Sequence, residues 1–128
     1  MTNFTITERR NDGVAVLDLA GMIRLGKGSI ELHEALRCLV ADGERKILLN
    51  LAGVTQIDSS GLGELVSGYR TLRQFGGELK LFHLSERIYE LLAMTKLLTV
   101  FDIYDNEPEA VGSFAVKSAK SVYAGSLM

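Results

Sequence analysis

Residues 46–51, with the sequence KILLNL, constrain the fold more than any other stretch of the chain. Side chains alternate between the two faces of a sheet, so an almost continuously apolar run implies that both faces are covered. Such strands are typical of the parallel sheets of α/β proteins. The run therefore predicts a central strand, with the rest of the domain built around it.

Strand and helix patterns alternate on both sides of this run. We expect strands at 4–7 and 14–19, joined as a hairpin by turn residues 11–13. Two helices follow on either side of the central strand: the apolar face of the first consists of Leu32, Ala35, Leu36, Leu39 and Val40, and the buried stripe of the second consists of Leu62, Leu65, Val66, Tyr69, Leu72 and Phe75. The rest of the chain predicts a strand at 79–82, a third helix capped by Ser85, a strand at 100–103 and a final helix at 107–114 with Pro108 in its first turn. This order predicts a single α/β domain. Its mixed, largely parallel sheet has four or five strands, with right-handed crossovers.

Length and composition limit the class of protein. The 128 residues fit one domain, which we place at 1–115, followed by a tail at 116–128 that has no acidic residue and little periodicity. The formal net charge of −2 gives no general attraction to nucleic acid or anionic lipid. One cysteine, no signal-like start and no apolar run of bilayer length predict a cytoplasmic protein without membrane insertion.

Enzymatic chemistry finds little support in the sequence. A serine nucleophile at Ser59 or Ser60 needs a general base, but His33 and His83 carry no catalytic motif and the G-x-S-x-G elbow is absent. Two separated histidines and one cysteine do not form a recognised metal-ligand set. We therefore expect no catalytic residues, no metal and no cofactor.

A glycine-rich stretch offers one alternative. Residues 21–27 read GMIRLGK and fit the start of a phosphate-binding loop, G-x-x-x-x-G-K. The next position should be Ser or Thr to hold magnesium, but Gly28 occupies it and the serine follows one place later. The stretch also follows the second strand of a hairpin. We expect a flexible loop with Lys27 in solvent.

The junction at 57–63, IDSSGLG, lies between the central strand and the second helix. Ser60 alone is explained as a helix N-cap. Gly61, Gly63 and Gly68 are not, because each glycine inside a helix costs about 1 kcal/mol relative to alanine. Either the helix packs tightly on the sheet, or another molecule approaches its backbone.

The same helix start favours an anion, because its free N–H groups and dipole are positive there. A phosphate on Ser60 would add about −1.5 to −2 charges at pH 7 beside Asp58. Phosphorylation would then change an exposed surface without unfolding the domain.

Residues 46–110 resemble the STAS domain of bacterial anti-sigma-factor antagonists, and the likeness extends over about residues 4–115. Its most specific part is the DSSGLG run at 58–63, and glycines 76 and 77 and the strand at 79–82 keep the spacing of the family. The resemblance implies a mixed sheet of four or five strands with helices mainly on one face.

The resemblance also implies partner switching. The unphosphorylated protein would bind an anti-sigma factor that is also a serine kinase, which frees a sigma factor. The kinase would then phosphorylate Ser60, and a metal-dependent serine phosphatase would remove the phosphate. The expected partner-binding residues are Asp58, Ser59, Gly61, Leu62, Gly63 and Arg24.

Arg24 departs from the family pattern. The family often has an acid after the second strand, in a pattern like G-x-L-D, whereas this chain has Gly21-Met22-Ile23-Arg24. The reversed charge either alters the choice of partner or pairs with a phosphate on Ser60. An alternative function is a STAS scaffold without a phosphoswitch, such as a subunit of a sensory complex or an accessory protein of a lipid-transport ATPase.

Overall fold

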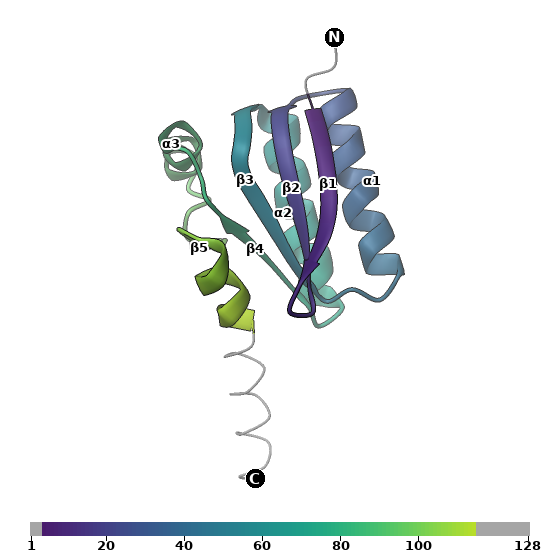
Figure 1. The fold of residues 1–128 in the computed structure, drawn as a ribbon. Coiled ribbons are helices and arrows are strands. Elements are labelled where there is room, and N and C mark those ends of the chain that lie inside the picture. Colours follow the sequence, from purple (N-terminus) through teal and green to yellow (C-terminus); the bar gives the residue numbers. More distant parts are fainter. Residues whose placement is uncertain (1–3, 115–128) are drawn as a thin grey trace.

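The computed structural model describes residues 4–114, and the predicted tail at 116–128 lies outside this range. The described residues form an α/β domain whose five strands make one sheet in the order β1-β2-β3-β4-β5 (Figure 1). The strands are β1 (Phe4–Asn11), β2 (Val14–Ile23), β3 (Lys46–Ile57), β4 (Glu78–Phe82) and β5 (Asp102–Tyr104). β1 and β2 form the expected antiparallel hairpin, and the remaining neighbours are parallel. The KILLNL run lies in the central strand β3, as predicted.

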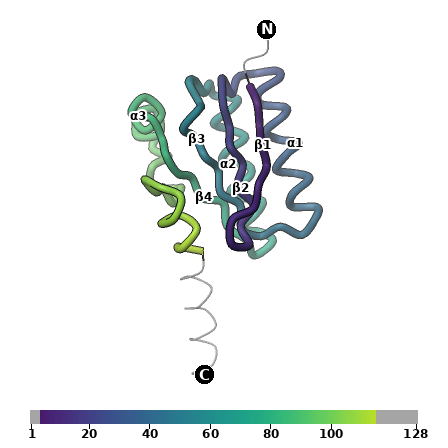
Figure 2. The backbone as a smooth tube through the Cα atoms, viewed as in Figure 1, coloured from purple at the N-terminus to yellow at the C-terminus, as the bar shows by residue number. Residues whose placement is uncertain are grey.

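Helices cover mainly one face of this sheet. α1 (Lys27–Ala41) and α2 (Ser59–Gln74) lie side by side behind β1–β3, and α3 (Glu86–Met94) follows β4 (Figures 1 and 2). Their apolar stripes join the inward residues of the strands in the larger core, which includes Leu17, Leu36, Leu49, Leu65, Leu81 and Leu92. Residues 107–114 are helical and pack on the opposite face, with Val111 and Phe114 against Val16, Leu48 and Phe82. Apolar residues at successive positions of β3 thus contact two different layers.

Several predicted boundaries were wrong. β1, β2 and β3 all run further than their apolar patterns, and the last strand is Asp102–Tyr104 rather than 100–103. The second half of β3 combines buried Val54 and Ile57 with exposed residues, so it lacks the continuously apolar pattern of residues 46–51. Two register shifts between β2 and β3 also interrupt the regular alternation.

Phe75 was wrongly placed in the buried stripe of α2. The helix ends at Gln74, and the Phe75 side chain is 56% exposed, with the Arg45 guanidinium 5.3 Å from its ring centroid. The other five predicted positions of the stripe are buried or half-buried, as expected for the face that packs on the sheet.

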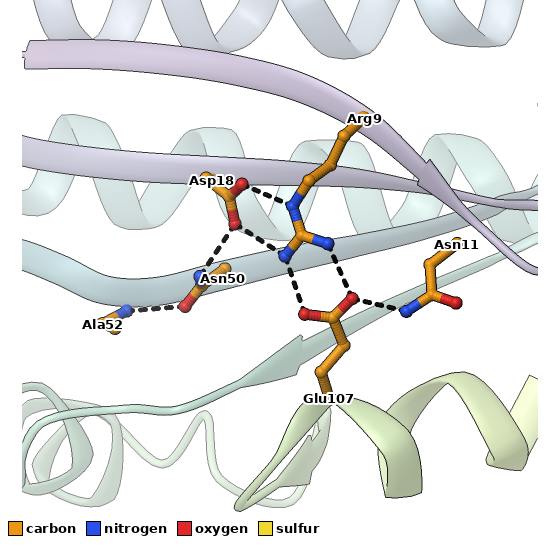
Figure 3. Close-up of polar contacts among 6 residues, drawn as sticks. All are labelled: Arg9, Asn11, Asp18, Asn50, Ala52 and Glu107. Atoms are coloured by element: carbon orange, nitrogen blue, oxygen red, sulfur yellow. Dashed lines mark hydrogen bonds and ion pairs between the residues drawn. The ribbon is translucent and has the colours of Figure 1, made fainter.

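A polar network attaches the C-terminal helix to the second face of the sheet (Figure 3). Arg9 donates to Asp18 (2.6 and 3.1 Å) and to both carboxylate oxygens of Glu107 (2.7 Å each). Asn50 donates to Asp18 and Asn11 donates to Glu107. Bonds from Arg9 lower the pKa values of both carboxyl groups and raise that of the guanidinium. The network joins three strands to the first turn of the helix at 107–114.

Lys80 is a buried lysine under the same helix. Its side chain is 2% exposed, and Nζ donates to Ser113 Oγ at 2.8 Å. The ammonium also lies 4.7 Å from the centroid of the Phe114 ring. These contacts compensate for the loss of hydration and fix the helix over β4.

Candidate functional site

The junction between β3 and α2 is organised by Asp58. The Asp58 side chain is the N-cap of α2: one carboxylate oxygen accepts from the Gly61 N–H (3.0 Å), and the other accepts from the Leu25 N–H (2.9 Å). These two bonds, from Leu25 first, lower the pKa of Asp58, and the charge of Arg24 contributes less. Asp58 therefore connects the turn before α1 to the start of α2.

Ser60 is not the N-cap, which corrects that interpretation of the sequence. α2 begins at Ser59, so Ser60 is the second helical residue and Gly61 lies inside the first turn. Three adjacent polar residues are all good caps, and the position where β3 ends selects Asp58. Ser59 is exposed, whereas Ser60 is half-buried.

The Ser60 hydroxyl is hydrogen-bonded to the hydroxyl of Ser29, in the first turn of α1. Ser29 is only 5% exposed, and it was not among the residues predicted for the site. The available signal was the pair Gly28-Ser29 immediately before the apolar pattern of the first helix. Its partner on α2 is distant in sequence and cannot be read from a local pattern.

The three glycines of α2 have different surroundings. A Cβ on Gly61 would lie 2.5 Å from the carbonyl oxygen of Ile23, and one on Gly68 would lie 2.7 Å from Leu36 Cδ1. Both positions are buried, so tight packing explains why they are glycines, and partner contact at Gly61 stays a prediction. Gly63 is exposed, and a Cβ there would meet no atom within 4 Å. Of the three, only Gly63 leaves its backbone open to a partner.

Two exposed apolar residues adjoin this junction. Leu25 is 82% exposed, although its N–H is bonded to Asp58, and Ile30, next to Ser29, is 61% exposed. Leu62 is half-buried, and Arg24 is exposed on the same turn as Leu25. Apolar groups beside a polar helix start are characteristic of a protein-binding surface.

The glycine-rich stretch does not form the flexible loop that we expected. Residues 21–23 end β2, and α1 already begins at Lys27, whose ammonium pairs with Glu31. A Cβ on Gly28 would lie 2.5 Å from the Met22 carbonyl oxygen, so this glycine serves packing. Within residues 4–114 there is no cluster of three or more His, Cys, Asp or Glu side chains that could hold a metal ion. None of the helices in the same range is long and apolar enough to cross a bilayer.

The sequence model described as "STAS domain" matches residues 5–110. The chain belongs to the STAS domain family. This confirms the resemblance, and the five-stranded mixed sheet confirms the fold that it implied.

Among curated STAS relatives, an anti-sigma F factor antagonist of Paenibacillus polymyxa is 29% identical over 91% of this chain and 99% of its own length. An anti-sigma-B factor antagonist of Bacillus subtilis is 32% identical over 79% of this chain and 91% of its own length. The anti-sigma factor antagonist SpoIIAA of Bacillus has been solved unphosphorylated and phosphorylated. Its two forms align with TM-scores of 0.64 and 0.67 at 18% and 19% identity, over 89% and 87% of this chain and 97% and 98% of theirs. These structural likenesses establish the STAS fold.

Proposed function

We propose that this STAS protein is an anti-sigma-factor antagonist that is switched by phosphorylation of Ser60. One observation carries the proposal: Ser60 lies in the first turn of α2, one helical turn before the open backbone of Gly63, at a junction that the exposed residues Leu25 and Ile30 adjoin. Relatives that carry the name of anti-sigma factor antagonist match most of the chain and support the same function. The protein acts by binding and is regulatory rather than enzymatic.

The unphosphorylated surface binds an anti-sigma factor that is also a serine kinase, in the cytoplasm. Leu25, Leu62 and Gly63 supply the apolar and open part of this surface, and Asp58 and Ser59 its polar part. A phosphate on Ser60 would have to lose its hydration between two fitted surfaces, which costs several kcal/mol unless cations meet it. Each 1.4 kcal/mol changes affinity tenfold, so the modification releases the partner. A serine phosphatase then restores the binding form.

Arg24 fits this scheme on the free protein. Its guanidinium is exposed near Asp58, and the bond that it donates to Met22 Sδ, at 3.3 Å, is weak. A phosphate on the next helix is a stronger acceptor for it. Together with the N-terminus of α2, Arg24 stabilises the phosphorylated form in the absence of the partner.

The test is a pull-down from the native cell with wild-type protein, Ser60→Ala and Ser60→Asp, followed by phosphosite mapping. We expect wild type and Ser60→Ala to retain a kinase-type anti-sigma factor, and Ser60→Asp to bind at least about tenfold more weakly. Ser59→Ala is the matched control and should be phosphorylated at Ser60 as in the wild type. Phosphate on Ser59, together with full binding by Ser60→Asp, would refute the assignment.

A further inference from the structure

The first turns of α1 and α2 are pressed against the same end of β2. A Cβ on Gly28 would lie 2.5 Å from the Met22 carbonyl oxygen and 3.0 Å from Ile23 Cα, and one on Gly61 would lie 2.5 Å from the Ile23 carbonyl oxygen. Each contact is with backbone, which cannot rotate away as a side chain can. The two glycines adjoin Ser29 and Ser60, and their missing side chains let the two hydroxyl groups meet.

The contact between the two serines belongs to a regular packing of the parallel helices α1 and α2. Ser29 bonds to Ser60, and one turn further along both helices His33 Nδ1 lies 2.9 Å from Glu64 Oε1. Another turn on, Leu36 lies against Gly68. Contacts repeated over three turns fix the position of one helix along the axis of the other. The helix backbones therefore hold the Ser29 hydroxyl beside Ser60.

We propose that Ser29 is a positioning residue for Ser60: it holds the acceptor hydroxyl in one rotamer and donates to the phosphoester oxygen after transfer. This inference rests on the proposed function, because it assumes that Ser60 accepts the phosphate. Ser59, the neighbouring hydroxyl, is exposed and has no corresponding partner from α1 among the described residues.

The chemistry of transfer determines the direction of this hydrogen bond. The Ser60 hydroxyl loses its proton to a base of the kinase, and its Oγ bonds to the γ-phosphorus of ATP. The bond from that phosphorus to the bridging oxygen breaks, and ADP leaves. Either serine can donate before transfer, but afterwards Ser60 Oγ has no hydrogen. Ser29 must then be the donor, and as donor it also leaves a lone pair of Ser60 Oγ free for the attack.

The first test uses the pure protein and needs no kinase. Three-bond NMR couplings report the χ1 rotamer of each serine. We expect one rotamer for Ser60 in the wild type and in Ser29→Thr, which keeps the hydroxyl, and averaging over rotamers in Ser29→Ala. Ser59, as internal control, should be averaged in all three proteins. An averaged Ser60 in the wild type, or a fixed one in Ser29→Ala, would overturn the proposal.

The second test installs phosphoserine at position 60 by genetic encoding and follows its 31P shift against pH. The second pKa of phosphoserine is about 6. A hydroxyl donor favours the dianion, so we expect Ser29→Ala to raise this pKa by about half a unit or more and Ser29→Thr to restore it. Equal values in all three proteins would contradict the donor role. Ser29→Cys, close in shape but a weak donor, replaces Ser29→Thr if the added methyl group prevents folding, and an intermediate pKa is then expected.

The kinase identified in the pull-down provides the readout that links Ser29 to function. We expect Ser29→Ala to lower kcat for phosphorylation of Ser60 about tenfold with KM for the protein unchanged, since a hydrogen bond to a charged group is worth about that factor. Unchanged kcat would remove Ser29 from the reaction. If Ser60 is never phosphorylated, the proposed function fails by itself, while the two NMR measurements still determine whether Ser29 holds Ser60.

Discussion

Gly61 and Gly63 are two residues apart in the same helix, yet substitution should have opposite effects. The Cβ of Gly61→Ala would lie 2.5 Å from the Ile23 carbonyl oxygen and 2.8 Å from Ile57 Cγ2, so α2 would have to move off the sheet. We expect a loss of about 1–3 kcal/mol in the free energy of unfolding, the usual cost of overpacking. Gly63→Ala adds a methyl group in open space and should stabilise the helix by up to about 1 kcal/mol. Urea unfolding of both variants measures the difference.

Substitutions of the two glycines should also differ in their effect on partner binding. The methyl group of Gly63→Ala projects from the exposed surface of α2, so we expect weaker capture of the partner by a protein that is at least as stable as the wild type. For Gly61→Ala we expect any change in binding to follow the loss of stability, because its Cβ would point into the sheet. If Gly63→Ala is destabilised like Gly61→Ala and still binds normally, then Gly63 has a packing role.

At the scale of elements, the sequence predicts what depends on local periodicity. The run at 46–51 identified the central strand, and the spacing of apolar residues identified three helices, although α1 begins earlier, at Lys27, than its apolar pattern. Where an element ends was less predictable, because β3 continues to Ile57 through two changes of register with β2. The end of β3 determines which residue caps α2. By residue type, Asp58, Ser59 and Ser60 are equally suitable N-caps, and only the end of the strand distinguishes them.

Contacts between elements that are distant in the chain could not be predicted from the sequence. The helix at 107–114 was predicted from Pro108 and its apolar residues, but its place on the second face depends on Arg9, which is 98 residues away from Glu107. The hydrogen bond between Ser29 and Ser60 likewise joins two helix starts that are 31 residues apart. In the sequence alone, polar side chains of this kind cannot be distinguished from ordinary surface residues, because their partners are distant in the chain.

The Arg9 network yields a prediction for the C-terminal helix. Glu107→Gln removes the charge that accepts two bonds from Arg9, and we expect a loss of about 1 kcal/mol in stability, as for a half-buried ion pair. Hydrogen exchange should become faster at residues 110–114 and stay unchanged in α2. Glu109→Gln, on an exposed residue of the same helix, is the matched control and should change neither. Uniform acceleration across the domain would show that the network supports the whole fold instead.

At the scale of the whole molecule, the proposed switch and the network that attaches the C-terminal helix lie in different places. The proposed switch lies where β2 and β3 end, and ligand sites of α/β sheets commonly lie at the carboxyl ends of parallel strands. The Arg9 network lies on the opposite face from α1 and α2, under the helix at 107–114. A phosphate on Ser60 therefore changes the partner surface while the contacts that attach the C-terminal helix stay intact.

The stability of both regions nevertheless depends on pH in the same way. Hydrogen bonds to their carboxylates lower the pKa values of Asp18, Asp58 and Glu107 in the folded protein. A group whose pKa is lower when folded binds fewer protons in the folded state, so its contribution to stability is complete above its unfolded pKa, about 4 for these residues. The contribution is lost as the pH falls through the folded values. The arginine partners stay charged over this range.

We therefore expect the urea midpoint to stay nearly constant from about pH 8 to pH 5.5 and to fall below about pH 4.5. Glu107→Gln cannot lose a charge at that position, so its midpoint should start lower and fall less steeply. Glu109→Gln should follow the wild-type curve. Hydrogen exchange at pH 4 should show the helix at 107–114 and the first turn of α2 opening before the centre of β3, because the carboxylates hold those two places and apolar packing holds the third. A midpoint that rises on acidification, or a Glu107→Gln curve parallel to the wild type, would contradict the assignment of these carboxylates.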